Sequence, residues 1–283
     1  MAISTARIAG RRIANGAFIA FCYFVTAIAL FFLAAILWTL AQKGLAGISV
    51  QTFTMDTPAA GSPGGLRNAI AGSIIMCLLG MAIALAIGIL AGTWLAEYSR
   101  DGRYGSAVRF INDILLSAPS ILVGLFIWYL LVKPLHHFSA LAGSVALALV
   151  AVPVIARTTE DVLRLQPTSL RESGVALGTP FWTVIRTILW RSAGSGILTG
   201  VLLAFARVSG ETAPLLFTAL NNQFFTWNVS KEMASLPAVM FNDALSAYDD
   251  LQRLAWAAAL IVSVSVLGVT IIARLLSREQ KST

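Results

Sequence analysis

Arg207 and Glu211 are oppositely charged residues inside a stretch of sequence that is otherwise apolar. They are four positions apart, so a helix places both side chains on one face. A charge at membrane depth costs about 2.5–3.5 kcal/mol, so each needs a partner or a water-filled cavity. The pair could simply fix the helix, or Arg207 could line a pathway and offer a charge-assisted hydrogen bond to an anion, with Glu211 holding it in place. Ser209 and Thr212 could add hydroxyl donors where Pro214 interrupts the helix.

A second group of residues predicts a sharp corner between two short helices. Ser169 and Glu172 have the spacing of a capping box, in which Ser169 is the N-cap and Glu172 is at N3. Pro167 keeps the preceding residues from being helical. The first helix is expected to end near Gly178, which can adopt the left-handed conformation.

The second short helix is expected to begin at Thr179 and Pro180, with Thr179 as the cap and proline at the first helical position. Apolar residues then recur at helical spacing and define one face, which comprises Phe181, Val184, Ile185 and Ile188. On local physics alone, this elbow could be a docking element or an amphipathic corner lying on a membrane surface.

The composition indicates which solvent surrounds these elements. The chain has 283 residues, of which 58% are hydrophobic and 12% are charged. A soluble domain carries about 25% charged residues, so this chain has too few to cover a surface that faces water. The formal net charge of +7 comes from scattered bases without interleaved aromatics, which argues against nucleic acid as a partner and favours anionic lipid headgroups.

Six stretches are long and apolar enough to cross a bilayer, which takes about 20 residues of helix. The expected fold is therefore an all-α integral membrane protein with about six transmembrane helices. The stretches cover about 17–41, 70–95, 111–132, 138–156, 197–220 and 254–276.

The distribution of basic residues predicts the orientation. With the N-terminus inside, fourteen Lys and Arg fall in cytoplasmic segments and five in external ones, so both termini are expected in the cytoplasm. The chain then divides into a cytoplasmic N-terminal segment (1–16), a transmembrane domain (17–276) and a cytoplasmic tail (277–283). Within the transmembrane domain, 157–196 form a cytoplasmic loop and 221–252 a partly helical periplasmic loop.

The run from Glu172 to Gly178, with Ile188 further on, resembles the EAA loop of ABC importer permeases. In that family the loop forms coupling helices that dock into a cleft of the ATPase subunit. Ser173 and Gly174 stand where the family has two alanines, and Trp190-Arg191 stands where Leu-Pro is usual. The resemblance assigns ATPase coupling to residues 157–196, and in particular to Glu172, Ser173, Gly174, Gly178, Phe181, Ile185 and Ile188.

Blocks on both sides of the loop narrow the family. Pro153–Glu160 before it and Gly210–Phe217 after it, the latter reading Gly-Glu-Thr-Ala-Pro-Leu-Leu-Phe, resemble phosphate-specific permeases of the PstA type. Gly64-Gly65 with Ala69, Ile70 and Gly72, and the block Pro119–Phe126, fit the same family in the same order. The resemblance implies a type I ABC importer permease in a bacterial inner membrane and makes phosphate the expected anion near Arg207.

The resemblance also implies partners. They are a second, homologous permease of the PstC type, two ATPase subunits of the PstB type and a periplasmic phosphate-binding protein of the PstS type. The chain has four lysines and none follows a glycine, so it lacks the Gly-Lys-Ser/Thr of a P-loop. ATP and Mg are therefore expected on the partner ATPase, with no cofactor, metal site or catalytic residue in this chain.

Three rival functions remain. A permease of the same class could import another oxyanion, such as phosphonate, sulfate or molybdate. A membrane-embedded hydrolase would need a convergent set of nucleophile, base and acid, yet no histidine lies inside an expected span. A passive channel would conduct without ATP.

Overall fold

The computed structural model describes residues 5–99 and 102–279, and within these ranges the chain is helical without any strand. Residues 1–4 and 280–283, which belong to the expected terminal segments, lie outside the described residues. The helices are α1 (Thr5–Gly47), α2 (Val50–Thr54), α3 (Arg67–Glu97), α4 (Arg103–Ser117), α5 (Ser120–Ile127), α6 (Lys133–Leu135), α7 (Ala140–Arg164), α8 (Thr168–Ala176), α9 (Phe181–Val184), α10 (Trp190–Ser192), α11 (Gly194–Ser209), α12 (Ala213–Thr218), α13 (Leu236–Ala244) and α14 (Asp249–Glu279). π-helical turns over Trp128–Val132 and Ile185–Leu189 join α5 to α6 and α9 to α10.

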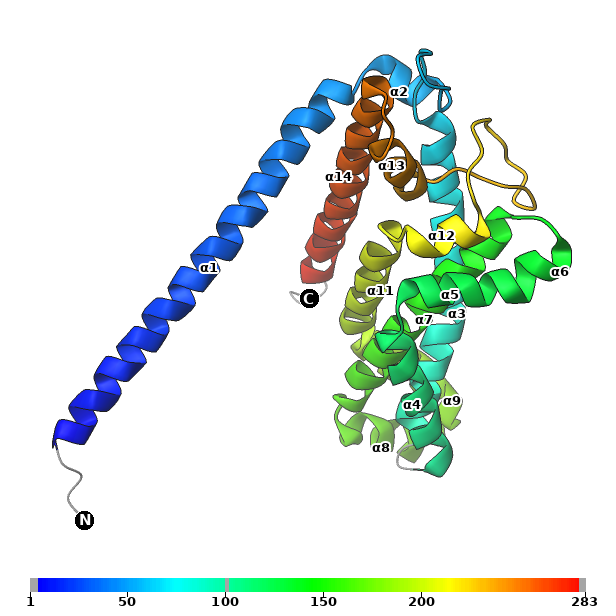
Figure 1. The fold of residues 1–283 in the computed structure, drawn as a ribbon. Helices are drawn as coiled ribbons and strands as arrows, with labels where there is room; N and C mark the ends of the chain where they lie inside the picture. The colour runs from blue at the N-terminus through cyan, green and yellow to red at the C-terminus, as the bar shows by residue number, and fades with distance from the viewer. Residues whose placement is uncertain (1–4, 100–101, 280–283) are drawn as a thin grey trace.

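The centre of the molecule is the pair formed by α3 and α7, which lie against each other along their length (Figure 1). Glycines of α3 allow this close approach: a Cβ at Gly80 would lie 2.9 Å from the Ser144 carbonyl oxygen, and one at Gly88 would lie 2.8 Å from the Ile155 Cβ. Helices in a membrane gain stability from such van der Waals contact because lipid supplies no hydrophobic driving force between them. Any side chain at these positions would push the two helices apart.

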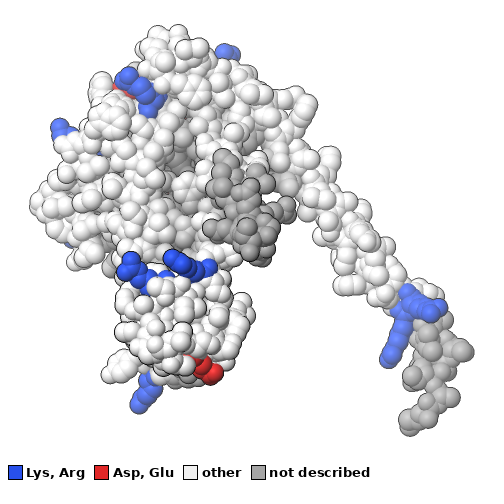
Figure 2. Space-filling model, turned by 180° about the vertical axis from the view of Figure 1, so that it is seen from behind, with Lys and Arg blue, Asp and Glu red and all other residues white. Residues whose placement is uncertain are grey.

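Helix α1 stands apart from the rest of the chain as a long rod (Figure 1). It contacts α14 only near its C-terminal end, where Gly44 approaches Leu260 and Gly47 approaches Ala257. The most apolar stretch of this helix is 0% buried inside the protein. Residues 13–42 of α1 include no charged residue, and Figure 2 shows basic side chains close to the N-terminal end of the rod.

The number of spans agrees with the expectation, but two of them are bent. Four helices, namely α1, α3, α7 and α14, are long and apolar enough to cross a membrane, and two bent pairs raise the number to six among the described residues. The expected third span is not one helix, because the chain turns by 106° between α4 and α5 at Ala118 and Pro119. Proline disfavours helical conformation in the residue before it, which explains the position of this bend.

The expected fifth span also differs from the structure. Helix α11 ends at Ser209 instead of continuing to residue 220, and α12 follows after a three-residue break. At its other end, α11 meets α9 and α10 at an angle of 74°. The expected loop 157–196 begins within a helix, because α7 continues through Arg157 to Arg164. Likewise, α1 already begins at Thr5, within the segment assigned to residues 1–16.

The two long outer helices, α1 and α14, run in opposite directions (Figure 1). Helix α1 ends, and α14 begins, at the end that carries α2 and α13, whereas α8 and α9 lie at the opposite end (Figure 1). The connection 221–252 is partly helical as expected, because it contains α13. The N-terminal end of α1 and the elbow therefore lie on the same side of the molecule (Figure 1). The assignment of that side to the cytoplasm remains a prediction.

Candidate functional site

The elbow predicted from the sequence is present as α8, a tight corner at Gly178, and a second helical run from α9 through α10. Helix α8 begins two residues earlier than expected, with Pro167 at the N-cap and no side-chain capping bond, so the Ser169–Glu172 capping box is wrong. Helix α9 begins after Pro180 instead of after Thr179. At both helices the extended backbone of a proline sets the start of the helix. Gly178 adopts φ +75°, which confirms the left-handed corner.

The residues expected to couple to an ATPase divide into two groups. Glu172, Ser173 and Gly178 are exposed, whereas Gly174 and Ile185 are buried. Phe181 and Ile188 are half-buried on the apolar face of the second helix, together with buried Val184. The exposed members are accessible from outside the chain, and the buried members hold the elbow together.

Gly174 shows why a small residue is needed inside the elbow. A Cβ at this position would lie 2.7 Å from the Val184 Cγ2 and 3.2 Å from the Ile188 Cδ1. Contacts this short force the neighbouring side chains to move. The absence of a side chain at residue 174 thus lets α8 pack on α9, and its direct role is within this chain.

An exposed apolar rim at the corner was not expected from the sequence. Val175, Leu177 and Trp182 are between 46% and 83% exposed, and Leu177, next to Gly178, is the most exposed of them. Large apolar side chains gathered on a protruding corner are typical of a surface that another protein covers. A leucine directly before the glycine of a helix C-terminus is the signal that could have identified this position.

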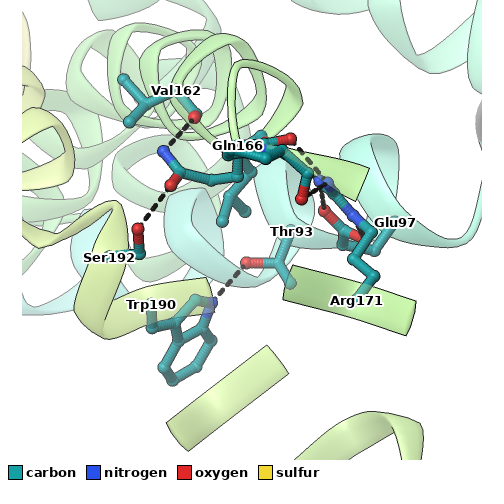
Figure 3. A network of polar contacts seen from close by, with 9 residues as sticks. Thr93, Glu97, Val162, Gln166, Arg171, Trp190 and Ser192 are labelled. Atoms are coloured by element: carbon teal, nitrogen blue, oxygen red, sulfur yellow. Dashed lines mark hydrogen bonds and ion pairs between the residues drawn. The ribbon is translucent and has the colours of Figure 1, made fainter. Parts of the chain in front are cut away.

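Polar contacts attach the elbow to the end of α3 (Figure 3). Arg171 of α8 donates to both carboxylate oxygens of Glu97, at 2.8 and 2.6 Å. Trp190 donates from its indole nitrogen to the Thr93 hydroxyl at 3.1 Å. The Glu97 side chain is fully buried. From the sequence, Arg171 counted only toward the charge distribution, and its pairing with Glu97 was not predicted.

Arg207 and Glu211 lie near each other, as their spacing predicts. The Arg207 Nε is 3.9 Å from the Glu211 Oε1, and their side chains are 40% and 16% exposed. This distance is too long for a hydrogen bond, so the pair is a loose electrostatic contact. The guanidinium therefore keeps donors available to a third group.

The structure does not bring Ser209 together with Arg207. The two residues are two positions apart on α11 and so point to nearly opposite sides of the helix. The Ser209 hydroxyl donates to the Phe205 carbonyl at 2.8 Å, and its side chain borders a cavity of about 120 Å³ between α3, α11, α13 and α14. Thr212 lies in the break before α12. The break precedes Pro214, which is the second residue of α12 and does not itself interrupt a helix.

Comparison with known proteins identifies the family. Residues 84–282 match the family model described as a binding-protein-dependent transport system inner membrane component. A phosphate transport system permease protein PstA from Haemophilus influenzae is 49% identical over 271 residues, which cover 96% of this chain and 96% of that protein. The chain belongs to the PstA family of membrane permeases. A probable phosphate transport system permease protein PstA from Methanocaldococcus jannaschii is 35% identical over 246 residues, covering 87% of each chain.

A solved structure shares the fold of this PstA family member. The inward-facing MetNI methionine ABC transporter matches with a TM-score of 0.63 at 18% identity, over 76% of this chain and 95% of that chain. At this identity the similarity concerns the fold alone. The family match and the sequence relatives show a multi-pass permease of the inner membrane.

The departure of this PstA family member from Leu-Pro at Trp190-Arg191 has a structural consequence. Because no proline stands here, helical structure continues through Trp190 and Arg191. It ends at Ser192. Trp190 also packs edge-to-face on Trp182, with ring centroids 5.7 Å apart. The residue that replaces leucine thus joins the second half of the elbow to α3 and to the exposed rim.

Proposed function

We propose that this chain is the permease subunit of an ATP-driven phosphate importer and forms half of its translocation pathway. The observation that carries the proposal is the similarity along nearly the whole chain to proteins named phosphate transport system permease protein PstA. The Gly-Glu-Thr-Ala-Pro block, which includes Glu211, supports phosphate over other oxyanions.

The proposed partners follow from this function. A second permease of the PstC type supplies the other half of the pathway, and a PstS-type protein delivers phosphate on the periplasmic side. Two PstB-type subunits bind ATP with Mg and hydrolyse it, since the sequence has no P-loop lysine. The chain itself then needs no cofactor.

The elbow is the proposed contact with the ATPase. Its corner presents Glu172, Ser173 and the apolar side chain of Leu177 to the outside, and it lies at one end of the molecule (Figure 1). An apolar anchor surrounded by polar side chains is the usual make-up of a stable protein contact. Closure of the ATPase pair would move the elbow and open the pathway to the other side.

Arg207 is the proposed phosphate contact. Its guanidinium is partly exposed and only loosely paired, so it can donate to a passing anion. Glu211 nearby limits the attraction, and conduction requires binding weak enough to allow release. Thr212, in the break before α12, can add a hydroxyl donor, whereas Ser209 faces another cavity and is the weakest member of the expected set.

The test is uptake by the complete complex in proteoliposomes. We expect labelled phosphate to enter only with ATP inside the accessible compartment and with the binding protein present. Excess sulfate, molybdate or phosphonate should leave uptake unchanged. Uptake without ATP would indicate a channel, and competition by one of the other anions would indicate a different cargo.

A further inference from the structure

We propose that the Glu97–Arg171 ion pair is the joint through which movement of the elbow reaches α3. This inference rests on the proposed function and names the residues that perform its coupling step. Both residues are positioning residues and need not touch ATP or the transported anion.

Two hydrogen bonds join the guanidinium of Arg171 to the carboxylate of Glu97 (Figure 3). The Arg171 Nε lies 2.8 Å from the Glu97 Oε2, and its Nη2 lies 2.6 Å from the Oε1. Two parallel bonds from a planar guanidinium fix orientation as well as distance. A single contact or an apolar contact would let α8 swivel against α3, whereas this fork does not.

Arg171 also connects three elements. The same guanidinium donates to the carbonyl oxygens of Leu163 and Gln166, each at 2.8 Å. Leu163 is in the last turn of α7, and Gln166 is in the connection from α7 to α8. Arg171 therefore holds the ends of α3 and α7 and the start of α8 at one point.

The second half of the elbow attaches to the same face of α3. Thr93 accepts a hydrogen bond from Trp190 at 3.1 Å, and Thr93 precedes Glu97 by one helical turn. Both residues are buried, at 2% and 5% exposure. The two halves of the elbow thus grip neighbouring positions, and any displacement of the elbow acts on the last turn of α3.

The other end of α3 is attached to the connection 221–252. Its glycines hold it tightly against α7, so that the two helices move together. Near its start, Asn68 donates to the Asn222 carbonyl at 2.7 Å, and Ser73 accepts from the Leu236 amide at 2.8 Å. A rigid helix joined at one end to the elbow and at the other to the connection 221–252 can carry a movement across the molecule.

Stability alone does not explain the pair. Replacing a buried ion pair by apolar residues of similar size is often neutral or stabilising, because the desolvation of two charges offsets their attraction. An apolar pair would therefore hold α8 against α3 as firmly. The fork contributes a defined orientation, and a coupling joint requires that property.

The experiment compares Glu97→Gln, which keeps the size and removes the charge, with Arg171→Lys, which keeps the charge and removes the fork. Each variant is assembled in the complete complex in proteoliposomes, and phosphate imported per ATP hydrolysed is measured. We expect basal hydrolysis to remain within about twofold and the ratio to fall about tenfold, in the range that coupling residues affect. The control is Asp161→Asn, since the Asp161 carboxylate is exposed and pairs with Arg157 of the same helix at 3.4 Å.

A wild-type ratio in both variants would overturn the proposal, and so would a parallel loss of hydrolysis and import. If either single variant fails to assemble, the double variant Glu97→Met with Arg171→Met keeps the contact apolar and buried. A ratio about tenfold low in this variant supports the joint, and a normal ratio overturns it. If the wild-type complex imports no phosphate, the proposed function fails, whereas stimulation of ATP hydrolysis by the binding protein still tests the joint.

Discussion

The guanidiniums of Arg207 and Arg171 are held in very different ways. Arg171 is 12% exposed and forked onto Glu97, whereas Arg207 is 40% exposed and 3.9 Å from Glu211. A guanidinium whose donors are already used in a buried fork cannot bind a passing ion without breaking that fork. The loosely held Arg207 is therefore suited to transient contact with an anion, and the tightly held Arg171 to a fixed joint.

Arg207→Gln tests the pathway role at this scale. We expect phosphate uptake to fall by about tenfold or more, because a hydrogen bond to a charged group contributes about 1.5–3 kcal/mol. Uptake of labelled phosphate by cells, at matched expression, measures this. The control is Arg253→Gln, an exposed arginine on α14. Full uptake by Arg207→Gln would remove Arg207 from the pathway and leave the pair as a helix-fixing contact.

At the scale of elements, short helices and their breaks shape the parts that are proposed to meet other molecules. The corner at Gly178 exposes Leu177, and the break between Ser209 and Ala213 turns α12 away from α11 (Figure 1). Breaks of this kind leave backbone groups without helical partners, and membrane proteins tolerate them inside the protein or next to water. Both places coincide with the residues that the proposed function uses.

Leu177→Asp tests the corner. Leu177 is 83% exposed, so the substitution should not disturb the fold of the chain itself. We expect co-purification of the ATPase subunits to fall by about tenfold or more, as for the central anchor of an interface. Leu245→Asp is the matched control, because Leu245 is 75% exposed after α13, at the opposite end. Equal recovery of the ATPase with both variants would place the contact elsewhere.

The junction of α13 and α14 predicts a dependence of stability on pH. Burial, together with the nearby charge of Asp250, raises the pKa of Asp243 from 3.8 to about 6. In the described part of the chain one of its carboxylate oxygens is buried without a hydrogen-bond partner. A raised pKa means that the folded state binds the proton more tightly, so this contribution to stability is present at low pH and is lost as pH rises through about 6.

Asp243→Asn should therefore raise the unfolding midpoint of the purified complex at pH 7.5. The gain corresponds to less than about 1 kcal/mol, because Asp243 is only half-buried and water screens its charge. The difference from wild type should shrink as the pH falls below 6 and the wild-type carboxyl becomes protonated. Thermal unfolding between pH 5 and 8 measures this, and a difference that stays constant with pH would contradict it.

At the scale of the whole molecule, the chain leaves a large apolar surface uncovered. Helix α1 packs on α14 near Gly44 and Gly47, and residues 11–38 are exposed (Figure 1). Figure 2 shows a broad band with few charges on the face in view, bordered by basic side chains. In a bilayer this surface is in contact with acyl chains or with helices of other subunits, which explains how so few charged residues suffice.

The orientation of the whole molecule can be tested with cysteine labelling. After replacement of Cys22 and Cys77, we introduce Ser62→Cys before α3 or Ser106→Cys on α4, both at exposed positions. With both termini in the cytoplasm, Ser62→Cys should react with an impermeant maleimide in cells whose outer membrane is permeable. Ser106→Cys should react only after the inner membrane is opened. The reverse pattern would invert the topology.

The sequence by itself determined the solvent, the number of spans and the elbow. Apolar stretches of about 20 residues specify membrane helices because bilayer thickness and helical rise are fixed. Gly178 specified its own corner, because a left-handed residue favours glycine. The family followed from motifs that the comparisons later confirmed.

Only the tertiary structure decided which residues of the elbow face outward and which hold it together. Gly174 and Ile185 were expected in the coupling set, and packing placed them inside. The joint between Glu97 and Arg171 depends on helices that are far apart in sequence. Local patterns do not encode such contacts, because a pairing across 74 residues is fixed by how α3, α7 and α8 pack.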